Sequence, residues 1–129
     1  MQKDFDKWNN LKKIIHNNEK NIFFHEREIW VCSIGLNVGY EQDGKNDEFI
    51  RPVIILSKFN NDIFCGVPLT SKEKNFPFYF SFKFKDGIST AIVSQLKTFD
   101  KRRLVRKLGM IAEPDFIKLK NRIKEIVNL

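Results

Sequence analysis

The stretch RPVIILS, residues 51–57, places a near-continuous aliphatic run behind an arginine–proline pair. Such a short apolar run predicts a buried β-strand, and the proline suits the strand's entrance because it donates no ladder hydrogen bond. Asn60-Asn61-Asp62 then predicts a turn, and IFCGVPL, residues 63–69, predicts the antiparallel partner strand. A β-hairpin is therefore expected at the centre of the chain.

The predicted hairpin brings Arg51 close to Thr70. A hairpin places the start of its first strand beside the end of its second, and the two residues lie at similar distances from the turn. An arginine fork beside the hydroxyl groups of Thr70 and Ser71 suits a phosphate group. Arginine and threonine also occur at strand ends for structural reasons alone, so the residues by themselves leave both interpretations open.

Further β-rich runs surround the hairpin, and together they predict five or six short strands. They are residues 27–34 (REIWVCSI), 76–84 (FPFYFSFKF), 89–99 (STAIVSQLKTF) and 107–112 (KLGMIA). A helical turn is expected over residues 100–105, and a polar loop over residues 35–48. In residues 76–84 aromatic side chains alternate with other residues, which is typical of a sheet with only one solvent-exposed face.

Amphipathic helices are predicted at both ends of the chain. In residues 4–18 apolar side chains recur by threes and fours, and the closing Asn17-Asn18 pair favours a left-handed turn. In residues 113–129 Pro114 suits the first helical turn. Short strands joined mainly by tight turns, with N-terminal and C-terminal α-helices, indicate a mainly β fold, a small and strongly bent antiparallel sheet or barrel.

The composition limits both the organisation and the location of the protein. A chain of 129 residues is one domain by size, and we expect a helical extension over residues 1–24 ahead of a single domain over residues 25–129. No apolar run approaches the length of a membrane span, and the N-terminus lacks the apolar segment of a signal peptide. We therefore expect a cytoplasmic protein without a membrane partner. Cys32 and Cys65 lie in apolar stretches and are predicted to be buried thiols.

The charge is uneven, and it favours an anionic partner. Residues 97–129 hold ten Lys/Arg against four Asp/Glu, whereas residues 1–96 hold thirteen against twelve. A basic excess in one part of a small domain favours nucleic acid, although a solvated helix face is the alternative. The sequence contains no HExxH, no phosphate-binding glycine loop and no GxSxG, and its acidic residues show no metal-type cluster. We expect neither a metal nor a cofactor.

Five motifs, taken in order, resemble the MazF/PemK (Kid) family of bacterial toxin endoribonucleases. They are EIW (28–30), GYEQDGK (39–45), RPVIILS (51–57), VPLTSK (67–72) and SQLKTFDKRRL (94–104). The resemblance implies an SH3-like, strongly curved β-barrel of the MazF/Kid/CcdB type, usually a homodimer. It implies metal-independent cleavage of single-stranded RNA by attack of the 2′-hydroxyl on the adjacent phosphate. It also implies a cognate antitoxin whose acidic C-terminal segment occupies the RNA groove.

The resemblance also assigns site residues. By matching motif, the family's catalytic arginine and threonine fall on Arg51 and Thr70, and its loop glutamate falls on Glu41. Arg51 would stabilise negative charge on the five-coordinate phosphate, Thr70 would donate to one of its oxygens, and Glu41 is the candidate general base. The candidate RNA-binding residues are Ser71, Gln95, Lys97 and Asn37. Gln95 and Lys97, two apart on a predicted strand, should share a face and contact a base edge and a phosphate.

Two departures from the family pattern and one alternative function accompany this assignment. The loop ahead of Arg51 is lengthened by KNDEFI, residues 45–50, which leaves the placement of Glu41 open. The N-terminal extension could add to a dimer interface or contact the antitoxin. The alternative function is non-enzymatic: a poison of DNA gyrase, or a nucleic-acid-binding regulator on the same fold. The joint presence of Arg51 and Thr70 argues for the enzyme, because simple binding does not require both.

Overall fold

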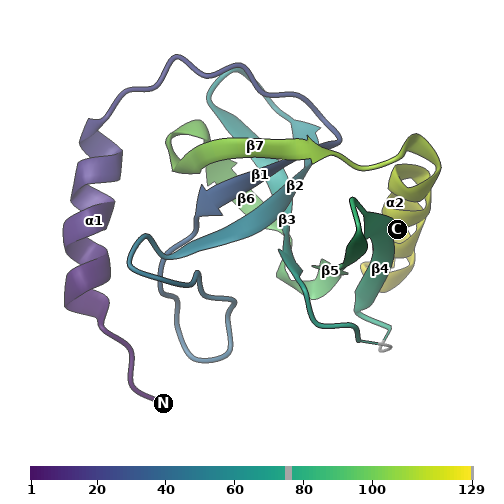
Figure 1. Ribbon diagram of the computed structural model, residues 1–129, viewed down its shortest axis with the longest axis horizontal. Helices are drawn as coiled ribbons and strands as arrows, with labels where there is room; N and C mark the ends of the chain where they lie inside the picture. Colours follow the sequence, from purple (N-terminus) through teal and green to yellow (C-terminus); the bar gives the residue numbers. More distant parts are fainter. Residues whose placement is uncertain (75–76, 129) are drawn as a thin grey trace.

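The computed structural model describes residues 1–74 and 77–128. Its elements along the chain are helix α1 (Phe5–Asn17), strands β1 (Glu28–Ser33), β2 (Ile50–Lys58), β3 (Ile63–Thr70), β4 (Tyr79–Phe84) and β5 (Gly87–Ile92), the 3₁₀ helix η1 (Val93–Gln95), strand β6 (Lys97–Asp100), the 3₁₀ helix η2 (Lys101–Arg103), strand β7 (Leu104–Met110) and helix α2 (Glu113–Ile126). Figure 1 shows a strongly curved sheet with α2 beside β4 and with α1 on the opposite side of the molecule. The predicted mainly β fold with a helix at each end is confirmed.

One antiparallel sheet contains all the strands of the described residues. The strand order is β4-β5-β3-β2-β1-β7, and β6 pairs with β3. Strand β3 thus pairs with β2 along one edge and with both β5 and β6 along the other. This sharing of one edge by two strands bends the sheet around β3.

The predicted central hairpin is confirmed. Strands β2 and β3 pair from Val53↔Pro68 to Lys58↔Phe64. In the turn, the Asn60 side-chain oxygen accepts from the backbone N–H groups of Asp62 and Ile63, at 2.8 and 3.0 Å. The asparagine therefore fixes the turn by local side-chain hydrogen bonds.

The aliphatic run of β2 is buried on both faces of the sheet. Ile54 belongs to an apolar cluster that includes Leu119 of α2, whereas Val53 and Ile55 belong to a second cluster that includes Phe64. All five side chains are completely or almost completely buried. Burial on both faces explains why this strand reads as a continuous apolar run rather than as an alternating one.

Several boundary predictions are wrong in the second half of the chain. Strand β7 spans Leu104–Met110 rather than residues 107–112. Residues 89–99 form β5, η1 and β6 rather than one strand, because the chain leaves the C-terminal end of β3 (Leu69↔Ala91) and rejoins β3 nearer its start (Gly66↔Lys97). Only Lys101–Arg103 form the helical turn expected over residues 100–105, since Leu104 already pairs in β7. Strand β4 starts at Tyr79 rather than Phe76, and residues 75–76 lie outside the described residues.

Helix α1 packs mainly through one residue. Trp8 is buried, whereas Phe5 and Ile14 are largely exposed. The helix ends at Asn17, and the backbone of Asn18 is extended (φ −103°), so the predicted left-handed turn is wrong. The Asn18 N–H group still closes the helix by donating to the Ile15 carbonyl at 3.2 Å, and the chain then runs extended towards β1.

Candidate functional site

Arg51 lies at the start of β2 with its side chain almost completely buried, at 8% exposure. Its Nε donates to the backbone carbonyl of Asp43 at 2.8 Å, and its Nη1 donates to the carbonyl of Leu69 at 3.2 Å. Burial lowers the pKa of Arg51 from its ordinary value, and the nearby charge of Asp43 opposes that shift. The guanidinium remains protonated at neutral pH, because arginine's ordinary pKa lies above about 12.

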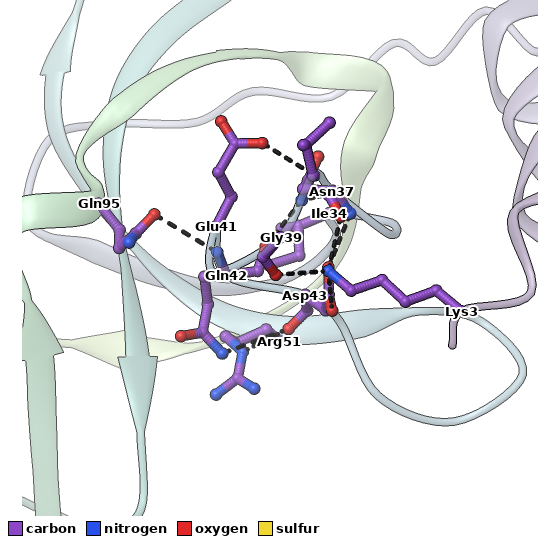
Figure 2. Close-up of polar contacts among 10 residues, drawn as sticks. Lys3, Ile34, Asn37, Gly39, Glu41, Gln42, Asp43, Arg51 and Gln95 are labelled. Carbon is purple, nitrogen blue, oxygen red and sulfur yellow. Dashed lines mark hydrogen bonds and ion pairs between the residues drawn. The ribbon is translucent and has the colours of Figure 1, made fainter. Parts of the chain in front are cut away.

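Gln42 supplies a third hydrogen-bond acceptor to this guanidinium. In the amide orientation that satisfies both side chains, its oxygen accepts from Arg51 Nη2 at 2.6 Å and from Nε at 3.1 Å. Figure 2 shows Gln42 and Asp43, from the loop that connects β1 to β2, beside Arg51. A guanidinium has five N–H donors, so these contacts fix its orientation and leave donors for a ligand.

Thr70 lies in the same cleft as Arg51. Continuing the β2–β3 ladder outwards from Val53↔Pro68 by two residues on each strand brings Arg51 opposite Thr70. Both residues, together with Ser71, line a cleft of about 200 Å³. The Thr70 hydroxyl oxygen accepts from the Lys72 N–H group at 3.3 Å, so its hydroxyl proton is available to a ligand. The structure thus brings together the arginine and the two hydroxyls that the hairpin argument paired.

The remaining predicted site residues line a second cleft. Asn37, Glu41, Gln95 and Lys97 all contribute to its wall, and its volume is about 220 Å³. The wall also contains Gln42 and Pro68, which are neighbours of the residues that line the Arg51 cleft. The loop between β1 and β2 therefore separates two adjoining clefts.

Gln95 and Lys97 share this second cleft for a different reason from the one expected. Gln95 belongs to η1 and only Lys97 belongs to a strand, so the argument from strand periodicity is wrong. The Gln95 side-chain oxygen accepts from the Gln42 N–H group at 3.4 Å, which joins η1 to the loop (Figure 2). Gln95 therefore lines the cleft from the 3₁₀ turn, and Lys97 lines it from the start of β6.

Glu41 is not brought together with Arg51. Its carboxylate accepts from the Val38 N–H group at 2.9 Å. Figure 2 shows the Glu41 side chain pointing away from Arg51, on the other side of the loop. The lengthened loop does fold over the site, but it presents Gln42 and the Asp43 carbonyl to the arginine.

Lys97 brings a positive charge to the second cleft, whose wall also holds the carboxylate of Glu41. Desolvation by the surrounding protein lowers the pKa of Lys97, and the positive charge of Arg103 acts in the same direction, whereas Glu41 opposes it. The Lys97 ammonium lies 5.2 Å from the centre of the Phe99 ring. An ammonium in such a position attracts an anionic group such as a phosphate.

Three residues of the site were assigned no role from the sequence. Gln42 and Asp43 hold Arg51 but lie in a polar loop, where such residues are common for reasons of solvation. Lys3 reaches the same loop from the N-terminal end of the chain. Only their contacts in the folded protein distinguish these side chains from other loop residues.

Residues 1–74 and 77–128, which the structure describes, include neither a cluster of metal ligands nor a membrane-spanning helix. No three His, Cys, Asp or Glu side chains of these ranges gather as metal ligands would. Within the same ranges no helix has the length and hydropathy to cross a membrane.

Cys32 and Cys65 are buried, as predicted, and burial raises the pKa of both thiols.

A family model places most of the chain among known proteins. The model for the PemK-like, MazF-like toxin of type II toxin–antitoxin systems matches residues 25–127. No curated protein matches the chain.

Solved structures share the fold at low sequence identity. MazF (Form-I) from Deinococcus radiodurans is 17% identical, with a TM-score of 0.70, and the alignment covers 84% of this chain and 100% of that one. An endoribonuclease in complex with its cognate antitoxin, from Mycobacterial species, is 16% identical, with a TM-score of 0.63 and coverage of 83% and 97%. The Mycobacterium tuberculosis toxin MazF-mt6 is 15% identical, with a TM-score of 0.62 and coverage of 80% and 98%.

Proposed function

Because this chain belongs to the PemK-like, MazF-like toxin family, we propose that it is a metal-independent endoribonuclease that cleaves single-stranded RNA at preferred sequences. One observation carries the proposal. Arg51 is buried, its guanidinium donates to three acceptors that fix its orientation, and it lines one cleft together with Thr70. A rigid cation beside a hydroxyl donor suits a group that gains negative charge during a reaction.

The proposed reaction is a transesterification at the phosphate on the 3′ side of the ribose whose 2′-hydroxyl attacks. The 2′-hydroxyl oxygen forms a bond to phosphorus, the bond to the 5′-oxygen of the next nucleotide breaks, and a 2′,3′-cyclic phosphate results. The 2′-hydroxyl proton goes to a base, and the 5′-oxygen gains a proton and leaves as a hydroxyl. Arg51 and Thr70 donate hydrogen bonds to the phosphate oxygens, which carry most charge in the five-coordinate transition state.

The base that accepts the 2′-hydroxyl proton is assigned to Glu41 as part of the proposal. Its carboxylate accepts from Val38 N–H and faces the second cleft, so it would have to turn within the loop to reach an RNA bound at Arg51. Arg51 cannot take this role, because a guanidinium does not lose its proton near neutral pH. A flexible loop side chain is compatible with such a movement on substrate binding.

The second cleft suits the recognition of neighbouring nucleotides. Gln95 and Asn37 carry amide groups that pair with base edges, and Lys97 supplies a cation for a backbone phosphate. Ser71 lines the Arg51 cleft, where it would contact RNA next to the scissile phosphate. The two adjoining clefts would therefore bind consecutive nucleotides of one strand.

The partners follow from the same family. The family belongs to toxin–antitoxin systems, and one structure with this fold is an endoribonuclease in complex with its cognate antitoxin. We propose a cognate antitoxin with an acidic C-terminal segment that competes with RNA for the two clefts, a homodimeric toxin, and a site of action in the cytoplasm.

Two assays, one in cells and one on the purified protein, separate the enzyme from the non-enzymatic alternative. Brief expression followed by mapping of RNA 5′ ends should give new ends at a short recurring sequence. A supercoiling assay with DNA gyrase should be unaffected. Inhibited supercoiling together with intact cellular RNA would contradict the proposal and favour a gyrase poison.

A further inference from the structure

The N-terminal end of the chain reaches into the loop that connects β1 to β2, residues 34–49. The Lys3 ammonium donates to the backbone carbonyls of Asn37 and Gly39, at 2.6 and 2.9 Å, and pairs with the Asp43 carboxylate at 2.9 Å. The Lys3 side chain is only 9% exposed. Figure 2 shows it entering the loop from the side opposite Gln95.

Asp43 connects Lys3 to Arg51. One carboxylate oxygen of Asp43 pairs with Lys3, the other accepts from the Asn37 N–H group at 2.7 Å, and its backbone carbonyl accepts from Arg51 Nε at 2.8 Å. Asp43 therefore binds the Lys3 ammonium with its side chain and the Arg51 guanidinium with its main chain. Movement of Asp43 would change the orientation of Arg51.

Helix α1 fixes the two ends of the same loop. The Trp8 ring contacts Phe49 edge-on, with ring centres 5.5 Å apart. A Cβ placed on Gly35, whose φ is +81°, would lie 2.1 Å from the Trp8 ring, so the indole packs directly on the glycine backbone. Lys7, one residue before Trp8, pairs with Asp47. The N-terminal segment thus touches the loop at its start, middle and end.

The loop needs such support for a physical reason. Its middle exposes Val38 and Tyr40, at 77% and 93%, so little apolar burial holds it in place. A loop of this length loses conformational entropy when it is ordered, and polar contacts must offset that loss. The three acceptors that gather on Lys3 provide a partly buried, charge-assisted anchor.

We propose that residues 3–8 clamp this loop and that Lys3 is a positioning residue for Arg51. The inference rests on the proposed nuclease function, and it concerns a segment that lies ahead of the family match at residues 25–127. Lys3 touches no substrate in this account. It fixes Asp43, and Asp43 in turn fixes the guanidinium that contacts the phosphate.

The test compares three single variants of the full-length protein with the wild type. Lys3→Met keeps the length of the side chain but removes the charge and the donors, and Lys3→Arg keeps both. Lys13→Met is the matched control, because Lys13 is an exposed residue of α1 with the same charge change. For each protein, amide hydrogen exchange is measured over residues 36–44, and the cleavage of an RNA oligonucleotide is measured as kcat and KM.

The clamp predicts a specific pattern across these measurements. Lys3→Met should speed exchange of the loop amides by about tenfold, because the loop opens more often. It should lower kcat by about tenfold with KM within about twofold of the wild type, because Arg51 is misplaced rather than removed. Lys3→Arg should recover most of both losses, and Lys13→Met should match the wild type.

Two results would overturn the proposal. Loop exchange in Lys3→Met that equals the wild type would show that Lys3 does not hold the loop. Faster exchange with unchanged kcat would show that the loop does not position Arg51. If the wild type leaves RNA intact, the nuclease function is wrong, and the exchange measurement still decides whether Lys3 holds the loop.

Discussion

Arg51 and Asp43 are joined by a hydrogen bond of 2.8 Å from the guanidinium Nε to a backbone carbonyl. The bond crosses from the first residues of β2 to the loop that precedes it, while the Leu69 carbonyl holds Nη1 from β3. Because both acceptors are main-chain atoms, the position of the guanidinium depends on the backbone of the loop and of the hairpin.

Replacing Thr70 by valine should slow RNA cleavage without unfolding the protein. Valine keeps the shape of threonine but removes the hydroxyl that would donate to the phosphate, and the expected loss in kcat is about tenfold or more. Thr98→Val on β6 is the matched control, because Thr98 is exposed and lines neither cleft. Equal rates for the two variants in a single-turnover assay would exclude Thr70 from the reaction.

Replacing Lys97 by methionine should weaken RNA binding and reduce its dependence on salt. One lost phosphate contact on a single strand lowers the slope of log K against log salt by about 0.7. The measurement is a titration with a 2′-deoxy analogue, which binds but lacks the attacking hydroxyl. Lys118→Met, on the exposed side of α2, should leave the slope unchanged. An unaltered slope for Lys97→Met would show that Lys97 does not contact an RNA phosphate.

Replacing Gly35 by alanine should destabilise the fold more than the same change at Gly39. Both residues have a positive φ, but a Cβ on Gly35 would collide with Trp8, whereas a Cβ on Gly39 would meet nothing within 4 Å. We expect a loss of about 2 kcal/mol or more at Gly35, and of about 1 kcal/mol at Gly39. Urea unfolding measures both. Equal losses would mean that Trp8 does not pack on this loop in solution.

Replacing Glu28 by glutamine should alter the response of stability to acid. Burial acts to raise the pKa of Glu28, but hydrogen bonds from Trp30, His25 and Lys107 outweigh it and hold the pKa below its ordinary value. A lowered folded-state pKa adds stability above the unfolded value of about 4.3, and that stability is lost as pH falls through the folded value.

Urea midpoints from pH 7 down to pH 3 test this assignment. Glu28→Gln should be less stable than the wild type at pH 7 by about 1–3 kcal/mol, because its amide cannot accept from all these donors. The gap should narrow below about pH 4, where the wild type also loses its carboxylate. A gap that stays constant over this range would contradict the lowered pKa.

The central hairpin and the Arg51–Thr70 pair could be predicted from sequence because they depend on local signals. The apolar run of β2, the Asn60 turn and the strand lengths together set which residues lie opposite one another. The break between β5 and β6 at Val93–Gln95 could not be predicted, since it follows from β3 pairing with two strands along one edge. The contacts of Lys3 with residues 34 or more positions away are tertiary and leave no periodic pattern.

Cleavage of a single-stranded RNA oligonucleotide in the presence of EDTA, by the wild type and by Arg51→Ala, tests the central claim most directly. The account predicts wild-type products that end in a 2′,3′-cyclic phosphate, and a rate for Arg51→Ala that is lower by about a hundredfold or more. Circular dichroism of both proteins checks that the variant is folded. An Arg51→Ala protein that is folded and cleaves at the wild-type rate, or a wild type that leaves the RNA intact, would contradict it.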